Sequence, residues 1–235
     1  MDTRPYYVPG SAIGPREGVK WDKSDRSCFS YSHNTSINIA SDGPLGVRYV
    51  QGVTAFAAGI HAASTWDIAL VRERGLFLGT EAKQLGVNVQ LGPSAGPLGK
   101  FAQGGRNWEG FGSDPYLQGI MMAQTIEGMQ EAGVQATAKH WIANEQELNR
   151  ETMSSDVPDK VLRELYVWPF MDAVHSNVAA MMCSYNKING TWACESDFVM
   201  KKLLKDELGF KGYVMSDWNG KQEHSSWRIS TDADL

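Results

Sequence analysis

The feature that most constrains the fold is a repeated alternation of short β-like runs with longer stretches of helical spacing. The β-like runs cover residues 36–40, 87–91, 134–138, 179–183 and 211–215. The stretches with helical spacing cover residues 65–85, 116–132, 158–176 and 196–208. Strands that alternate with helices form a parallel sheet with helices packed on it, so the sequence predicts an α/β fold.

Local signals mark the ends and faces of these helices. Ser113-Asp114-Pro115 joins a capping side chain to a proline, which predicts a helix start, and Gly209 predicts the end of the helix over 196–208. We expect a kink at Pro169. The spacing predicts a buried face in each of two helices. In the helix over 65–85 this face carries Trp66, Leu70, Val71, Leu78 and Leu85. In the helix over 158–176 it carries Val161, Leu162, Leu165, Trp168 and Val174.

Polar side chains follow the strands at their carboxyl ends. They are Asp42, Arg106, Lys139, His140, Tyr185 and Asp217. Active sites of (β/α)8 barrels lie at this end, whereas doubly wound sheets also bind ligands there. The pattern favours a (β/α)8 TIM-like barrel and leaves the doubly wound sheet open. A barrel typically needs ~250 residues, and this chain of 235 offers six or seven strand candidates. We therefore expect the barrel to be incomplete at both ends.

The tetrapeptide Met215-Ser216-Asp217-Trp218 joins a carboxylate to an indole at the end of a β-like run. An indole packs against the apolar face of a sugar ring, and a carboxylate can attack its anomeric carbon. Asp217 could equally be a turn residue or a helix cap.

A second polar cluster holds Lys139-His140-Trp141, Asn144-Glu145 and Arg150. Lys and Arg only donate hydrogen bonds, so fixed in place they select hydroxyl oxygens of a sugar. Asp42 would accept hydrogen bonds from two hydroxyls of the same ring. The alternatives are a solvated loop around one satisfied histidine and, for Asp42, a turn before Gly43-Pro44.

Several functional classes are disfavoured. Gly92-Pro93-Ser94-Ala95-Gly96 matches the esterase nucleophile pattern, but the glycines and prolines after Ser94 cannot supply the helix that this motif needs. The net charge of -5 and the lack of a basic run argue against nucleic acid. No run of 18 apolar residues could cross a membrane, and residues 1–5 show no signal peptide. The spacing of histidines and cysteines predicts no metal and no cofactor.

Two further features bear on the cellular compartment. A return of the chain at Asn189-Gly190 could bring Cys183 and Cys194 together in a disulfide, or both could be buried thiols. The sequons at Asn34 and Asn189 predict N-glycosylation and favour a secreted protein.

Five motifs together resemble glycoside hydrolase family 3, in particular the fungal-type β-glucosidases. They are residues 42–48 (DGPLGVR), 91–115 (LGPSAGPLGKFAQGGRNWEGFGSDP), 139–147 (KHWIANEQE), 182–186 (MCSYN) and 212–218 (GYVMSDW). The resemblance implies that residues 42–219 form the family's N-terminal barrel domain. Residues 1–41 would then be a divergent N-terminal segment and residues 220–235 a tail unlike the family.

The resemblance implies a secreted β-glucosidase that removes terminal glucose from cello-oligosaccharides or aryl glucosides by a retaining mechanism. Asp217 would be the nucleophile. The terminal sugar would contact Asp42, Arg106, Lys139, His140, Arg150, Tyr185 and Trp218. In this branch a glutamate of a later domain is the acid/base, and we expect this chain to lack it. The alternative is an impaired, sugar-binding fragment.

Overall fold

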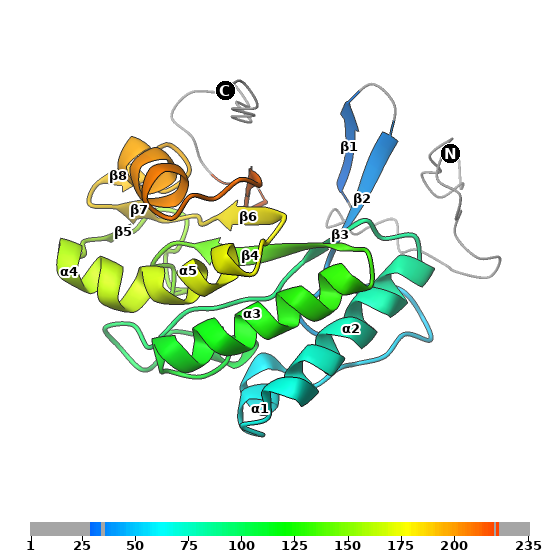
Figure 1. Ribbon diagram of the computed structural model, residues 1–235. Helices are drawn as coiled ribbons and strands as arrows, with labels where there is room; N and C mark the ends of the chain where they lie inside the picture. The colour runs from blue at the N-terminus through cyan, green and yellow to red at the C-terminus, as the bar shows by residue number, and fades with distance from the viewer. Residues whose placement is uncertain (1–28, 34–35, 219, 221–235) are drawn as a thin grey trace.

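The central element is a parallel sheet whose strands follow one another in chain order. The computed structural model describes residues 29–33, 36–218 and 220. Five strands run parallel: β2 (Ser36–Asp42), β3 (Val89–Leu91), β4 (Gln135–Trp141), β6 (Ala180–Cys183) and β9 (Tyr213–Ser216). A sixth, β1 (Phe29–His33), pairs antiparallel with β2 and extends the sheet as a hairpin (Figure 1).

The helices lie along one face of this sheet (Figure 1). The three that pack side by side are α2 (Ile68–Gln84), α3 (Pro115–Glu131) and α5 (Trp168–His175). The remaining helical segments are α1 (Gly59–Ala63), η1 (Asn107–Glu109), α4 (Asp159–Val161), η2 (Leu162–Val167) and η3 (Phe198–Glu207). Among the described residues the strand order never reverses, as it would in a doubly wound sheet. The structure is therefore an incomplete TIM-like barrel, as the sequence predicts.

The two faces of the sheet carry different side chains. Ala136, Ala138 and Met181 are fully buried in the cluster that joins the sheet to the helices. The opposite, concave face carries Leu91 and Met182 in a smaller apolar cluster. Across this face the Tyr213 hydroxyl of β9 donates to Gln135 Oε1 of β4 at 3.0 Å, although β6 lies between the two strands. A contact between strands that are not neighbours shows how strongly the sheet curls.

The predicted start of α3 is confirmed, whereas the start and the buried face predicted for the helix over 65–85 are corrected. The Asp114 side chain accepts a hydrogen bond from the Leu117 amide at 2.7 Å, which caps α3 in front of Pro115. The helix predicted over 65–85 begins at Ile68 instead. Trp66 lies before it with a φ of 56° and is 76% exposed, and Leu70 is also exposed. The prediction that both are buried is wrong, because α3 packs against the face of α2 that carries Val71 and Leu78.

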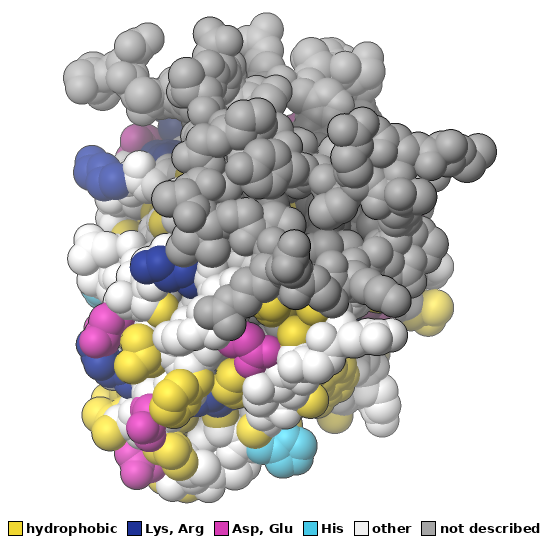
Figure 2. Space-filling model, turned by 90° about the vertical axis from the view of Figure 1, so that its right-hand side faces the viewer, with side chains coloured by type: hydrophobic (Ala, Val, Ile, Leu, Met, Phe, Trp, Pro, Cys, Tyr) yellow, Lys and Arg dark blue, Asp and Glu magenta, His cyan; other side chains and the backbone are white. Residues whose placement is uncertain are grey.

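One side of the molecule has a surface of mixed character. Figure 2 shows hydrophobic side chains between charged ones on the side of the molecule at the right of Figure 1. Among the described residues, no helix is both long enough and apolar enough to cross a membrane.

Pro169 lies inside a continuous helical stretch from Asp159 to His175. The turns directly before it, Leu162–Val167, are π-helical. A proline lacks an amide hydrogen and crowds the carbonyl four residues earlier, and a wider turn relieves both problems. Leu162 is fully buried as predicted, but Val161 is 41% exposed, which corrects its expected inward position.

A small three-stranded sheet lies beyond β6 and contains the predicted return of the chain. It consists of β5 (Ser154–Ser155), β7 (Lys187–Ile188) and β8 (Thr191–Trp192). Cys183 and Cys194 form a disulfide with their Cα atoms 5.3 Å apart, which decides between the two alternatives that the sequence leaves open.

The two sequons differ in what the structure describes. Asn34 lies outside the described residues, as does the tail from residue 221 onward. Asn189 is exposed in the turn between β7 and β8, with a φ of 48°. Its side-chain oxygen accepts a hydrogen bond from the Val157 amide at 2.8 Å, and its amide nitrogen donates to the Val157 carbonyl at 3.3 Å. A glycan on Asn189 remains a prediction, and it would have to share this nitrogen.

We expect Gly75→Ala to destabilise the protein although alanine is the better helix former. A Cβ at residue 75 would lie 2.5 Å from the Thr125 carbonyl oxygen, a backbone atom of α3 that cannot move alone. Overpacking of this kind costs about 1–3 kcal/mol. Gly119→Ala is the matched control, because its Cβ meets only the Asp172 side chain. Urea unfolding checks the difference, and equal midpoints for the two variants would contradict it.

Candidate active site

Asp42 lies at the carboxyl end of β2, within a group of cations. Lys139 of β4 donates from Nζ to Asp42 Oδ1 at 2.6 Å, and Arg48 Nη1 lies 2.9 Å from Oδ2. The Lys139 side chain is only 3% exposed. Burial alone would raise the pKa of Asp42, but the attraction of Lys139 and Arg48 outweighs it and holds that pKa below its ordinary value. Asp42 therefore stays ionised and can accept hydrogen bonds from a ligand.

Arg48 is a site residue that the sequence analysis did not single out. The residue stands in the motif 42–48 but received no role there. The intervening turn, which carries Gly46 at a φ of 115°, returns the chain so that Arg48 reaches the Asp42 carboxylate. The signal in the sequence that could have indicated this contact is the position of Arg48, six residues after Asp42 and beyond the Gly43-Pro44 turn.

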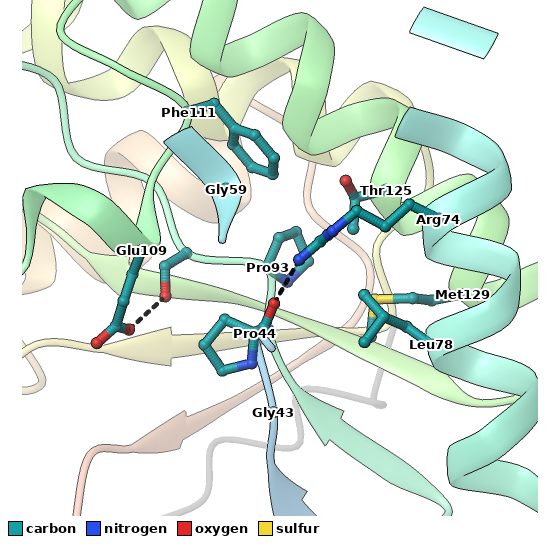
Figure 3. Close-up of a pocket in the computed structure, with 12 residues that line it drawn as sticks. Gly43, Pro44, Gly59, Arg74, Leu78, Pro93, Glu109, Phe111, Thr125 and Met129 are labelled. Carbon is teal, nitrogen blue, oxygen red and sulfur yellow. Dashed lines mark hydrogen bonds between the residues drawn. The ribbon is translucent and has the colours of Figure 1, made fainter. Parts of the chain in front are cut away.

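The buried Gln90 and the partly buried Arg74 hold the backbone that follows Asp42. Gln90 donates from Nε2 to the Gly43 carbonyl at 2.8 Å. Arg74 of α2 donates to the carbonyls of Pro44 and Ala57, the former at 2.7 Å (Figure 3). Burial lowers the pKa of Arg74 to about 10, so this guanidinium remains charged at neutral pH. The position of Asp42 is thus fixed from both the sheet and the helix layer.

Asp217 follows β9 and is 8% exposed. Its Oδ1 accepts a hydrogen bond from the Trp218 amide at 2.8 Å, and Oδ2 lies 3.6 Å from His140 Nε2. Among the described residues, no donor reaches hydrogen-bonding geometry with Oδ2. Burial raises the pKa of Asp217, while Lys139, the Trp218 amide and Tyr185 lower it, with a net rise above the ordinary 3.8.

His140 is held neutral beside this carboxylate. Burial lowers its pKa well below the ordinary value, and the positive charges of Lys139, Arg106 and Arg150 lower it further. A neutral imidazole does not form an ion pair with Asp217. The Asp217 oxygens therefore keep their capacity to attack an electrophile.

Tyr185 approaches the same carboxylate from the loop after β6, and Arg150, from the loop after β4, packs on the Tyr185 ring. The Arg150 guanidinium lies 4.7 Å above the Tyr185 ring, a distance typical of cation–π contact. Burial and the negative charge of Asp217 raise the pKa of Tyr185, so its hydroxyl stays protonated. Trp218 packs partly buried against the apolar cluster of the concave face.

Arg106 reaches the site from the long loop between β3 and α3. It lies close enough to influence the pKa of both Asp42 and Asp217. Gln118, fully buried on α3, anchors this loop: its Nε2 donates to the carbonyls of Gly96 and Gly112, and its Oε1 accepts from the Gly96 amide at 2.7 Å. The loop is thereby fixed despite its many glycines.

A buried polar network supports the strand end that carries Lys139 and His140. Ser184 accepts a hydrogen bond at its Oγ from the Ile142 amide at 2.9 Å. Asn186, fully buried, donates to the carbonyls of Ile142 and Ala143 at 3.2 Å. Sequence reasoning assigned no role to Ser184 or Asn186, because their contacts lie about 40 residues away along the chain.

The structure therefore brings the predicted site residues to one end of the sheet. Direct contacts join Asp42 to Lys139, His140 to Asp217, and Arg150 to Tyr185. The arrangement combines hydrogen-bond donors, one ionised acceptor and one carboxylate with a free oxygen. Among the described residues, no group of three or more His, Cys, Asp or Glu side chains is placed to hold a metal ion.

Comparison with known proteins gives a consistent result. The model of the "Glycosyl hydrolase family 3 N terminal domain" matches residues 30–232. "Beta-glucosidase cel3A" of Pyricularia oryzae is 63% identical over 209 residues, which are 87% of this chain and 28% of that protein. "Probable beta-glucosidase L" of Aspergillus terreus is 64% identical over 218 residues, 91% of this chain and 29% of that protein. The chain thus spans less than a third of the length of these relatives.

Solved structures agree with the sequence relatives. "Beta-D-glucoside glucohydrolase from Trichoderma reesei" has a TM-score of 0.78 and 64% identity, covering 79% of this chain and 26% of that one. "Beta-glucosidase 3B from Thermotoga neapolitana in complex with glucose" has a TM-score of 0.77 and 34% identity, covering 84% and 30%.

We expect Lys139→Met to raise the pKa of Asp217. Lys139 is the strongest of the charges that lower this pKa, so its removal leaves burial with less opposition. Carboxyl carbon NMR titration, with Asp217 assigned by its loss in Asp217→Asn, measures the change. Lys160→Met, at an exposed position of α4, is the control. An unchanged pKa in Lys139→Met would contradict the prediction.

We expect Asp42→Asn to destabilise the protein by about 3–5 kcal/mol, since it leaves Lys139 buried without its counterion. The double variant Asp42→Asn, Lys139→Met should recover much of that loss, because the buried charge is then gone. Chemical denaturation at neutral pH checks both variants. A double variant less stable than Asp42→Asn would show that the ion pair is not the cause.

Proposed function

Because the chain belongs to glycosyl hydrolase family 3, we propose that its site takes part in the hydrolysis of terminal β-glucosides, with Asp217 as the nucleophile. The observation that carries this proposal is the Asp217 carboxylate, buried at the sheet's carboxyl end with a neutral histidine 3.6 Å from Oδ2. In the part of the chain that the structure describes, no hydrogen-bond donor reaches this oxygen in suitable geometry. In a retaining mechanism this oxygen attacks the anomeric carbon, the bond to the leaving oxygen breaks, and a covalent glycosyl-enzyme forms.

The surrounding donors and Asp42 suit the hydroxyls of one terminal sugar. Lys139 and Arg48 hold the Asp42 carboxylate in place, and carboxylate oxygens can each accept from a sugar hydroxyl. Arg106, Arg150 and His140 would supply donors, and Trp218 an apolar face. Such hydrogen bonds strengthen as the ring approaches an oxocarbenium-like state. These sugar-contacting residues, the clamp, therefore assist the chemistry as well as the binding.

A retaining mechanism also needs an acid/base carboxyl group about 5–5.5 Å from the nucleophile. Asp42 cannot fill this role, because its ion pairs with Lys139 and Arg48 keep it ionised. We propose that the acid/base comes from outside this site, and that the 235 residues by themselves are impaired in protonating the leaving group. General acid help is worth about 10²- to 10⁴-fold in rate, and activated aryl glucosides need it least.

The substrate class and the compartment follow from the same proposal. The named relatives are β-glucosidases, and one solved structure holds glucose, which supports a β-glucoside or cello-oligosaccharide as substrate. The Cys183–Cys194 disulfide supports a secreted protein, because structural disulfides persist mainly in oxidising compartments.

We expect a 2-deoxy-2-fluoro glucoside with an activated leaving group to label Asp217. The fluorine slows breakdown of the glycosyl-enzyme, and the activated leaving group removes the need for an acid. Peptide mass spectrometry locates the label, which Asp217→Asn should abolish and the exposed control Asp206→Asn should retain. Labelling should weaken as the pH falls through the raised pKa of Asp217, since only the ionised carboxylate attacks.

Folded wild-type protein that binds glucose without taking the label would contradict the catalytic proposal. That result would favour a sugar-binding role for this chain.

A further inference from the structure

We propose that Glu109 is a positioning residue for Arg106. Its buried carboxylate fixes the plane of this guanidinium and ties it to the strand frame, which is β4 with Lys139 and the backbone around Ser94 that pairs with it. The inference rests on the proposed function, in which Arg106 contacts the sugar. It gives a role to a residue that stands in the motif 91–115 but received no role there, and that has no direct place in the chemistry.

The contact between the two side chains is bidentate. Arg106 Nε donates to Glu109 Oε1 at 2.8 Å, and Nη2 donates to Oε2 at 2.9 Å. Glu109 is 5% exposed, whereas the Arg106 side chain is 29% exposed. Two of the five guanidinium N–H bonds thus point at the carboxylate, and the other three lie on the edges of the planar guanidinium that face away from it. These remaining donors are the ones that can reach a ligand.

Glu109 is in turn attached to the strand frame through Ser94. The Ser94 hydroxyl donates to Glu109 Oε2 at 3.3 Å, although the two residues are 15 positions apart in the chain. The backbone around Ser94 runs along β4: the Ala95 amide donates to the Lys139 carbonyl at 2.8 Å, and the Lys139 amide donates to the Pro93 carbonyl at 3.1 Å. Arg106 and Lys139 therefore share one rigid support.

This arrangement also explains Ser94, the centre of the esterase-like pattern. The residue is 5% exposed, and its hydroxyl faces a carboxylate. A serine nucleophile would instead face a histidine base. The serine thus orients Glu109.

The alternative partners of Arg106 show why a fixed carboxylate matters. Besides Glu109, the carboxylates that act on Arg106 include those of Glu147, Asp217 and Asp42. Without Glu109 the guanidinium is free to turn toward Asp217 and pair with the nucleophile. Another arginine–glutamate pair near the site, Arg150 with Glu147, is about 30% exposed on both sides, and solvent screens such a pair more than it screens one with a buried carboxylate.

The decisive experiment measures the labelling kinetics of the full 235-residue protein with the 2-fluoro glucoside at several concentrations. We expect Glu109→Gln to lower the second-order labelling rate by about 10- to 100-fold, because an amide cannot accept both guanidinium N–H bonds and a misplaced group costs this much. The labelled fraction at completion should stay at the wild-type level. If Glu109 only stabilised the fold, its replacement would instead lower the labelled fraction. The molecules that remain folded would then label at the wild-type rate at each concentration of the 2-fluoro glucoside.

A double-mutant cycle separates action through Arg106 from an independent effect. If Glu109 acts only through Arg106, adding Glu109→Gln to Arg106→Ala changes the labelling rate by less than about 2-fold. If the two residues act independently, the rate loss of the double variant is the product of the losses of the single variants. Ser94→Ala should give a smaller loss than Glu109→Gln. Glu127→Gln, which removes a surface partner of Arg72, is the matched control and should label like wild type. Multiplying effects, or a wild-type rate in Glu109→Gln, would overturn the proposal.

An NMR measurement keeps the inference testable if wild-type protein takes no label. The Arg106 Nε–H signal, assigned by its loss in Arg106→Ala, should exchange slowly with water in wild type and rapidly in folded Glu109→Gln. A second outcome is exchange that is slow in wild type and rapid in Glu109→Gln while neither protein takes the label. That result would support the positioning role and count against the proposed function only. Equal exchange in both proteins would overturn the positioning role.

Discussion

The structure of the site depends on one constraint: a lysine buried in the sheet needs a carboxylate beside it. Lys139 is 3% exposed, and Asp42 neutralises it at 2.6 Å from two strands away. A buried ammonium without a partner would be strongly destabilising. The carboxyl ends of β2 and β4 must therefore lie close together across β3, and the parallel pairing of the three strands places both ends at the same edge of the sheet. Arg74 and Gln90 then hold the turn after Asp42 in the position that the ion pair requires.

The same charges divide the two aspartates into different roles. Asp42 lies within hydrogen-bonding distance of two cations and stays ionised. Asp217 accepts a hydrogen bond from the Trp218 amide on Oδ1, lies close to Tyr185, and has a histidine 3.6 Å from Oδ2. That histidine is neutral because burial and the neighbouring cations oppose its protonation. One carboxylate is thereby suited to hydrogen bonding and the other to attack. Environment alone, acting on the same side chain, makes this distinction.

Loops carry much of the site, and the helix layer makes them rigid. Gln118 of α3 binds the glycine-rich loop that carries Arg106, and Glu109 binds the arginine itself. Close packing of α2 on α3 in turn depends on Gly75, where a side chain would collide with the backbone of Thr125. Functional groups on loops reach useful precision when buried polar contacts of this kind fix them. The precision of the clamp therefore begins in the packing of the helices.

The sequence by itself determined the parallel α/β architecture, the start of α3 at Pro115 and the end of the sheet that carries the polar residues, because period, caps and strand ends are local properties. It also indicated Asp42, Lys139, His140 and Asp217 as site residues, whose catalytic and binding roles remain proposals. Only the tertiary structure decided which face of α2 is buried, so that Trp66 and Leu70 are exposed, and whether Cys183 and Cys194 pair. It alone revealed Arg48, Gln118 and Glu109 as supports of the site. Their partners are set by how loops fold back onto the sheet, and neither residue type nor local spacing encodes those distances.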